Sequence, residues 1–163
     1  MDCKEFYLDD FMAVAAIPIA NIPLSVLSYP ANQLSPTISN ADITSSMLAG
    51  AITIGVVPAY EDGIVVPIVR RTGKAKDDES DSVAGRLHTV TVSCEIDERD
   101  PSVWSHLLTL ERTPAHLLLM FRGGARAFVS ATEDTYLCSV GRDGAKTTVT
   151  FKVHNLMGLQ MLV

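Results

Sequence analysis

The sequence of 163 residues contains few cysteines and no CxxC pair. Its three cysteines, Cys3, Cys94 and Cys138, are odd in number and lie far apart, which is not typical of a disulfide framework. The opening residues 1–5 are acidic, whereas a secretory signal would begin with positive charge. We therefore expect free thiols and a protein that stays inside the cell where it is made.

Long apolar runs and excess positive charge are also missing. The most apolar early run, residues 11–20, contains Pro18 and is far too short to span a bilayer, so no membrane contact is expected. The net charge is −6 and the isoelectric point is about 5.1. This acidic balance argues against nucleic acid as the main partner.

No motif for metal, nucleotide or catalytic chemistry stands out. None of the four histidines has a ligand spacing such as i, i+4 on a helix; they are His88, His106, His116 and His154. Residues 141–148 look like a phosphate-binding loop, but Ala145 replaces the glycine that must precede Lys146. The better interpretation is a hairpin turn, and we expect no cofactor, no metal and no enzymatic activity.

The clearest structural signal is the alternation of apolar and polar residues over 87–96. The apolar set on one face is Val90, Val92, Cys94 and Ile96. Successive side chains of a strand point to opposite faces, so this pattern predicts a half-buried β-strand.

A helix is predicted over residues 102–111. Asp100 is a suitable N-cap, Pro101 suits the first helical position, and Pro114 stops the helix. The spacing i, i+3, i+4, i+7 predicts one apolar face, made of Val103, Trp104, Leu107, Leu108 and Glu111.

Three hairpins are predicted from apolar runs that flank glycine turns. The first joins residues 52–57 to 64–69 through Asp62-Gly63, and the second joins 117–121 to 126–130 through a Gly-Gly turn. The third joins 136–140 to 147–153 through Asp143-Gly144.

The segment 11–60 has Asp42 as its only acid or base, tyrosines aside. Four prolines in its first half exclude a long helix, and a short helix over 46–49, capped by Asn40 or Asp42, is expected before Gly50. A segment so short of charge must cross the core or lie against another molecule.

Residues 70–86 show no apolar period and carry mixed charge, which predicts a mobile loop. Such a loop is either featureless and solvated or a contact to a neighbouring subunit. The candidate contact residues are Arg70, Arg71, Lys74, Lys76, Asp77, Asp78, Glu79, Asp81 and Arg86.

Together these elements predict one domain over 1–163 that is mainly β (α+β). We expect an antiparallel β-sandwich or a partly closed barrel with one flanking α-helix. Hydrophobic residues make up 47% of the chain and the mean hydropathy is +0.22. This content favours burial against other subunits over an unusually apolar core.

The runs 87–92, 103–108 and 155–160 resemble small prophage-encoded structural proteins of gut bacteria, namely tail, neck or connector components. The order of elements is similar to that of tail-tube-type proteins, which combine a β-sandwich or barrel, a flanking helix and a loop that contacts the next subunit. The resemblance implies a non-enzymatic assembly protein, a homo-oligomer bound to other particle proteins. It would occupy the bacterial cytoplasm during assembly and then the virion.

Two other functions remain open. The chain could be a bacterial ligand- or peptide-binding β-domain, or an enzyme whose site is assembled from scattered residues. A large apolar pocket with converging polar groups would favour either one. Broad flat apolar faces with unpaired strand edges would favour assembly.

Overall fold

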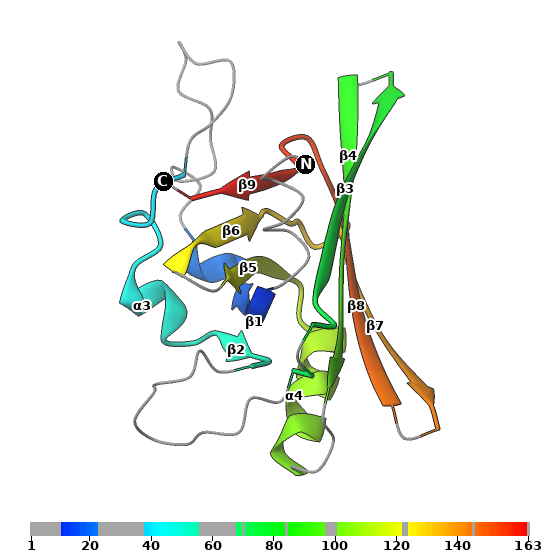
Figure 1. Ribbon diagram of the computed structural model, residues 1–163. Coiled ribbons are helices and arrows are strands. Elements are labelled where there is room, and N and C mark those ends of the chain that lie inside the picture. Colours follow the sequence, from blue (N-terminus) through cyan, green and yellow to red (C-terminus); the bar gives the residue numbers. More distant parts are fainter. Residues whose placement is uncertain are drawn as a thin grey trace.

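Two antiparallel β-sheets facing one another form the body of the protein (Figure 1). The computed structural model describes residues 11–22, 38–55, 68–69, 71–83, 85–96, 101–121, 124–144 and 146–162. The sheets do not close into a barrel, so the prediction of a mainly β sandwich is confirmed in its open form.

The first sheet has the strand order β2-β1-β5-β6-β9. Its strands are β1 (Phe11–Pro18), β2 (Ile52–Thr53), β5 (Ala115–Phe121), β6 (Arg126–Val129) and β9 (Leu159–Met161). The second sheet has the order β3-β4-β8-β7. It consists of β3 (Lys74–Ser82), β4 (Gly85–Ile96), β7 (Tyr136–Asp143) and β8 (Lys146–Asn155). The helical elements are η1 (Ile19–Asn21), α3 (Ser45–Leu48) and α4 (Pro101–Arg112).

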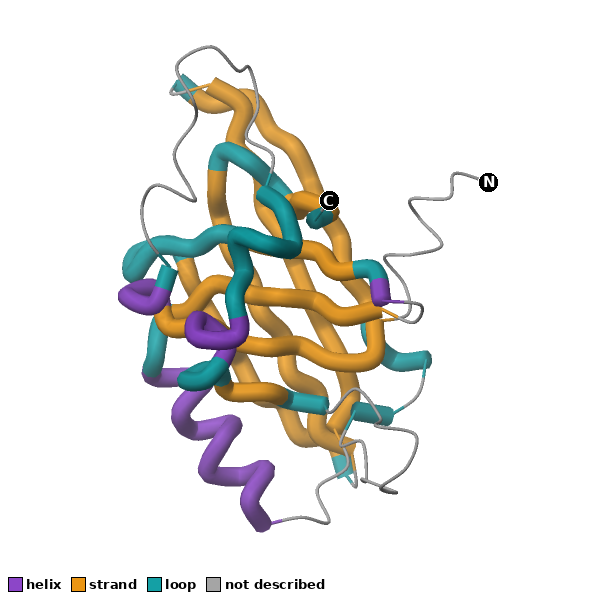
Figure 2. Tube along the Cα trace, turned by 90° about the vertical axis from the view of Figure 1, so that its left-hand side faces the viewer, coloured by secondary structure: helices purple, strands orange, loops and turns teal. Residues whose placement is uncertain are grey.

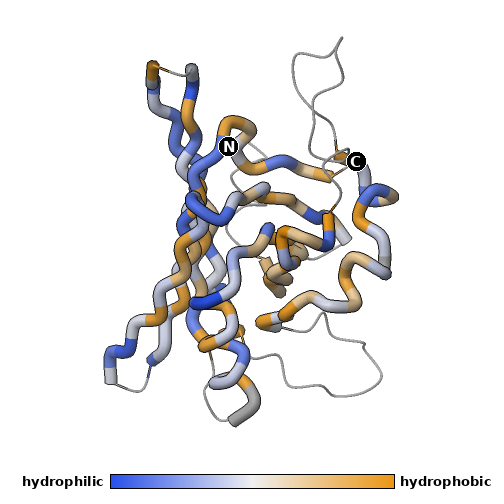
Figure 3. The backbone as a smooth tube through the Cα atoms, turned by 180° about the vertical axis from the view of Figure 1, so that it is seen from behind, coloured by the Kyte–Doolittle hydropathy of each residue, from blue (hydrophilic) through white to orange (hydrophobic). Residues whose placement is uncertain are grey.

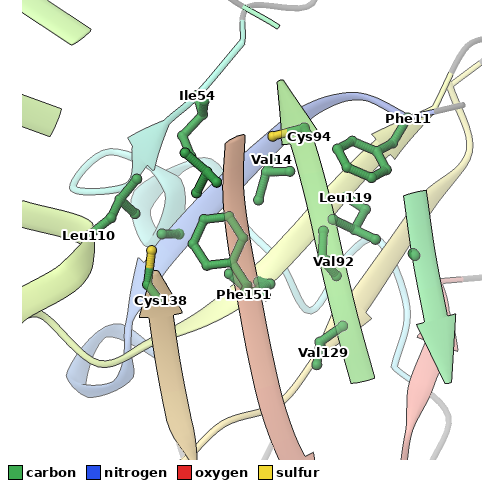
Figure 4. Packing of buried hydrophobic residues seen from close by; sticks show 14 of the residues in the cluster. Phe11, Val14, Ile54, Val92, Cys94, Leu110, Leu119, Val129, Cys138 and Phe151 are labelled. Carbon is green, nitrogen blue, oxygen red and sulfur yellow. The ribbon is translucent and has the colours of Figure 1, made fainter. Parts of the chain in front are cut away.

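The main core lies between the two sheets (Figure 4). On β4, the four residues predicted to face inward from 90 to 96 are all buried, which confirms the alternation. The register places Val92 opposite Phe151 and Cys94 opposite Val149, so β8 continues the same apolar face. These side chains meet Leu117 and Leu119 of the other sheet.

A second core cluster covers the other face of the first sheet. Residues 38–51, including α3, lie over that face (Figure 2). Ile38 and Ile43 pack there against Leu118 and Phe128. Because both faces of this sheet are covered, residues 13–17 of β1 are all buried. The expectation that the charge-poor segment crosses the core is thus met at β1, whereas residues 23–37 lie outside the described part.

The predicted helix is present as α4, but its buried face differs from the prediction. Val103, Leu107 and Leu110 are buried, Trp104 is half-buried, and Leu108 is 49% exposed. The prediction that Leu108 faces the sheet is wrong, because the i, i+4, i+7 positions counted from Val103 include Leu110 instead.

The second and third predicted hairpins are confirmed as the pairs β5–β6 and β7–β8. Gly144 has a φ of 62°, the left-handed value that a tight turn after Asp143 needs. Residues 141–143 therefore end one strand and residues 146–148 begin the next, as expected from the missing glycine.

The first predicted hairpin is wrong in the residues that can be compared. Ile52 and Thr53 pair with β1, whereas Ile68 bridges Ile96 in the other sheet. The two sides therefore belong to different sheets, and the turn at Asp62-Gly63 lies outside the described residues. The short helix is α3, whose N-cap is Thr44. Neither residue predicted to cap it does so.

The prediction of a loop over 70–86 is also wrong. Nine residues of it form the edge strand β3, which pairs with β4 from Lys74↔Ser93 to Ser82↔Gly85. Only Ala75 of this strand is buried. The strand is held by backbone hydrogen bonds to β4 and does not depend on buried side chains. Its sequence therefore shows no alternation of apolar and polar residues.

Candidate functional site

The β3–β4 hairpin projects beyond the body of the sandwich (Figure 1). The last pair between β4 and β8 is His88↔Asn155, whereas β3 and β4 stay paired as far as Ser82↔Gly85. Three residues of strand span about 10 Å. We call residues 79–83 and 85–88 the arm. Beyond the His88↔Asn155 pair at its root, no other strand of the described structure pairs with either side of it.

The inner face of this hairpin changes from apolar to charged along its length. On β4 the buried series that includes Val90 continues outward as His88 and Arg86. On β3 the buried Ala75 is followed on the same face by Asp77 and Glu79. The core thus ends at the root of the arm and a cluster of ionisable groups begins there.

A polar junction at this root joins segments that are far apart in the sequence. We define it as Asp77, His88, Asn155, Gly158 and Leu159. Nδ1 of His88 lies 2.8 Å from Oδ1 of Asp77, and the Leu159 amide donates to Oδ2 of Asp77 at 3.0 Å. The junction therefore holds β3 and β4 against the turn that leads into β9.

Asn155 extends the junction to the first sheet. Its side-chain Nδ2 donates to the carbonyl of Ser130, just after β6, at 2.8 Å. Its Oδ1 accepts from the Gly158 amide at 2.6 Å. One amide side chain thus ties together the end of β8, the following turn and the opposite sheet.

Gly158 is required by this close approach. Its φ of 68° is left-handed, and a Cβ added here would overlap the Asp77 carboxylate and lie 2.7 Å from Nδ1 of His88. A glycine lets the turn lie directly against the Asp77–His88 pair.

Further ion pairs follow outward along the hairpin. Nε2 of His88 lies 3.6 Å from Oε1 of Glu79, and Nη1 of Arg86 lies 3.4 Å from Oε2 of the same carboxylate. Lys76 pairs with Asp78 at 3.5 Å on the opposite face. The side chains of Glu79 and Arg86 are 53% and 75% exposed, so this contact contributes little stability.

The structure thus divides the nine predicted contact residues into groups. Five of them form ion pairs within the hairpin: Lys76, Asp77, Asp78, Glu79 and Arg86. Lys74, Asp81 and Arg71 are exposed, Arg71 with a φ of 64°, and Arg70 is outside the described residues. Sequence reasoning missed His88, although its parity with Val90 and Val92 signalled an inward position.

The buried ionisable groups lie in the cores and are held uncharged. Burial is the main cause that raises the pKa of both Cys94 and Cys138 to about 12. They lie on β4 and β7 with β8 between them, so their Cα atoms are about 9 Å or more apart. This separation is too large for a disulfide without backbone movement. Burial also raises the pKa of Tyr136, whose hydroxyl donates to the Leu110 carbonyl at 2.8 Å.

A small cavity lies where α4 passes the end of the first sheet. It is lined by Thr53, Ile54, Val103, His106 and Leu107 and has a volume of about 20 Å³, enough for one water molecule. Within the described residues, no group of three or more His, Cys, Asp or Glu side chains could hold a metal ion. No helix in this part of the chain is long and apolar enough to cross a membrane.

The chain matches no family model, and searches of the curated proteins and of the solved structures found no match either. The candidate site is therefore defined by its geometry alone.

Proposed function

We propose that this protein is a non-enzymatic structural subunit of a phage or phage-like particle, a tail or neck component that acts by self-association. In this proposal it is made in the bacterial cytoplasm and becomes part of the virion with other particle proteins. The observation that supports it best is the arm, a two-stranded ribbon that extends about 10 Å past the sheet. An isolated two-stranded ribbon is marginally stable in water, so contact with a neighbour would stabilise it.

The two edges of the four-stranded sheet differ in chemical character. The β3 edge carries eight charged or hydroxyl residues, and its remaining member is the buried Ala75. On β7 the only charged residues are Arg142 and Asp143, and Leu137 is 60% exposed. A contact between two unlike edges is heterologous, and repetition of such a contact builds rings or filaments. This is the kind of assembly that a tail or neck requires.

The exposed face of the same sheet is polar. Its hydroxyl residues are Thr89, Thr91, Ser93, Ser139, Thr148 and Thr150. In Figure 3 hydrophilic and hydrophobic residues alternate along these strands, as expected where one face is buried and the other exposed. A polar face argues against association through broad apolar surfaces, so we propose contact between strand edges, where unpaired backbone groups are available.

Two matched variants test this proposal, because Leu137 and Thr91 are both cross-strand neighbours of Lys152. Leu137→Glu adds charge to the β7 edge, whereas Thr91→Glu adds the same charge on the internal strand β4. Light scattering across protein concentration should show growing mass for the wild type and for Thr91→Glu. It should show reduced association for Leu137→Glu, because a charged edge resists strand pairing.

A wild-type protein that stays monomeric at high concentration and ignores the products of neighbouring genes would overturn the proposal. Specific binding of an extended peptide by such a monomer, lost in Leu137→Glu, would favour a peptide-binding domain instead.

A further inference from the structure

We propose that His88 is a protonation-dependent clamp that holds the two strands of the arm together at its root. The inference goes beyond the proposed function, because it concerns one subunit and does not require assembly. It rests on the position of the His88 ring between two carboxylates at the root of the arm, Asp77 at 2.8 Å and Glu79 at 3.6 Å.

The two ring nitrogens make unequal contacts. Nδ1 faces Asp77, whose other oxygen already accepts the Leu159 amide, and the side chains of His88 and Asp77 are only 15% and 23% exposed. Nε2 faces Glu79, which is 53% exposed and lies one step farther along the arm. The inner contact joins the arm to the polar junction, whereas the outer contact joins the two strands of the arm.

Only the protonated ring can donate from both nitrogens, since the neutral ring carries one N–H. The shorter and more buried contact to Asp77 retains that proton when the ring is neutral. Nε2 then presents a lone pair to the Glu79 carboxylate, and the contact is lost. Deprotonation of His88 therefore loosens the pairing of the two strands at the root of the arm and leaves the contact with Asp77 in place.

No other described group facing the ring changes charge over the same pH range. Arg86 lies on the far side of Glu79 and competes for it in both states of His88. The turn that packs on the pair contributes Gly158 and the Leu159 amide, which are uncharged. His154 is on the opposite face, where its Nδ1 lies 3.0 Å from the Thr89 hydroxyl.

Histidine side chains in general change charge between pH 5 and 8, so this is the pH range over which the clamp is tested. The outer contact is about half exposed, and exposed pairs of this kind are weak. Its loss should change the opening equilibrium of the arm about two- to fivefold.

The test is amide hydrogen exchange of residues 79–88 in the full-length protein, at low concentration, between pH 5.5 and 8. Rates are corrected for the intrinsic pH dependence of exchange. In the wild type, protection of the arm should fall about two- to fivefold as pH rises. In Glu79→Gln and in His88→Gln it should be low and independent of pH.

His154→Gln is the matched control, because it removes a histidine of the same sheet that faces away from the arm. It should keep the wild-type pH dependence. Glu79→Gln keeps the buried Asp77–His88 pair, so it tests the clamp even if His88→Gln does not fold. Constant protection in the wild type, or an unchanged pH dependence in Glu79→Gln, would overturn the clamp without bearing on assembly.

Discussion

The stability of the protein should fall in mild acid because of one buried histidine. His116 lies on β5 and is fully buried, and its ring centre lies 5.5 Å from that of Phe128, a member of the second core cluster. Its Nδ1 accepts the amide of Ala131 at 2.9 Å, which assigns the proton of the neutral ring to Nε2. Burial lowers the pKa of His116 to about 4 from 6.5, because a charged ring is poorly solvated there.

The sign and the size of the effect follow from this lowered pKa. The unfolded chain binds a proton at His116 as pH falls below about 6.5, whereas the folded chain stays neutral until about pH 4. The contribution of the neutral ring is therefore fully present above 6.5 and is lost between 6.5 and 4. One pH unit in this window lowers the free energy of unfolding by at most about 1.4 kcal/mol, and the full loss is on the order of 3 kcal/mol.

Urea unfolding at pH 7.5, 6.0 and 5.0 measures this dependence for the wild type and for His116→Gln. Both should share the slope that arises from other groups, and the wild type should show an additional loss of about 1 kcal/mol between pH 6.0 and 5.0. His106→Gln, on the exposed side of α4, is the control and should behave as the wild type. Identical slopes for wild type and His116→Gln would refute the reasoning.

Three other predictions follow from the packing. Leu110→Ala should cost about 2–5 kcal/mol in urea unfolding and Leu108→Ala less than about 1 kcal/mol, because only Leu110 is buried; equal losses would mean that the buried face of α4 is wrongly assigned. Gly158→Ala should lower the melting temperature and expose the arm to hydrogen exchange, and a neutral effect would count against the close approach at the junction. Without reductant, Cys94 and Cys138 should react with an alkylating reagent only after denaturation, and rapid labelling of the native protein, read by mass spectrometry, would contradict their burial.

The elements that could be predicted from the sequence are those whose side chains face an apolar core. The alternation of apolar and polar residues from 90 to 96 could be recognised because each inward-facing residue of β4 packs against the first sheet. The two C-terminal hairpins could be found because local turn residues join strands that are also neighbours in the sheet.

The remaining elements could not be predicted from local sequence patterns. An Asp-Gly turn signals a change of direction, but it does not decide which sheet each flanking run joins, and here Ile52 and Ile68 join different ones. β3 faces the core only at Ala75, so periodicity had nothing to detect along most of its length. The polar junction depends on contacts between residues as far apart as Asp77 and Leu159, which no local pattern contains.

The charged residues lie in the part of the β3–β4 hairpin that adds no burial to the core. Their position therefore distinguishes a role of the hairpin in stability from a role in assembly. Val90 and His88 have the same parity on β4, yet one lies in the core and the other marks its end. Each residue beyond that point costs about 1–2 kcal/mol of backbone entropy to order, and no core burial offsets it. Exposed ion pairs such as Glu79–Arg86 contribute too little to compensate. This cost supports the proposal that the arm contacts another molecule. The Asp77–His88 junction then determines the direction in which the arm is presented.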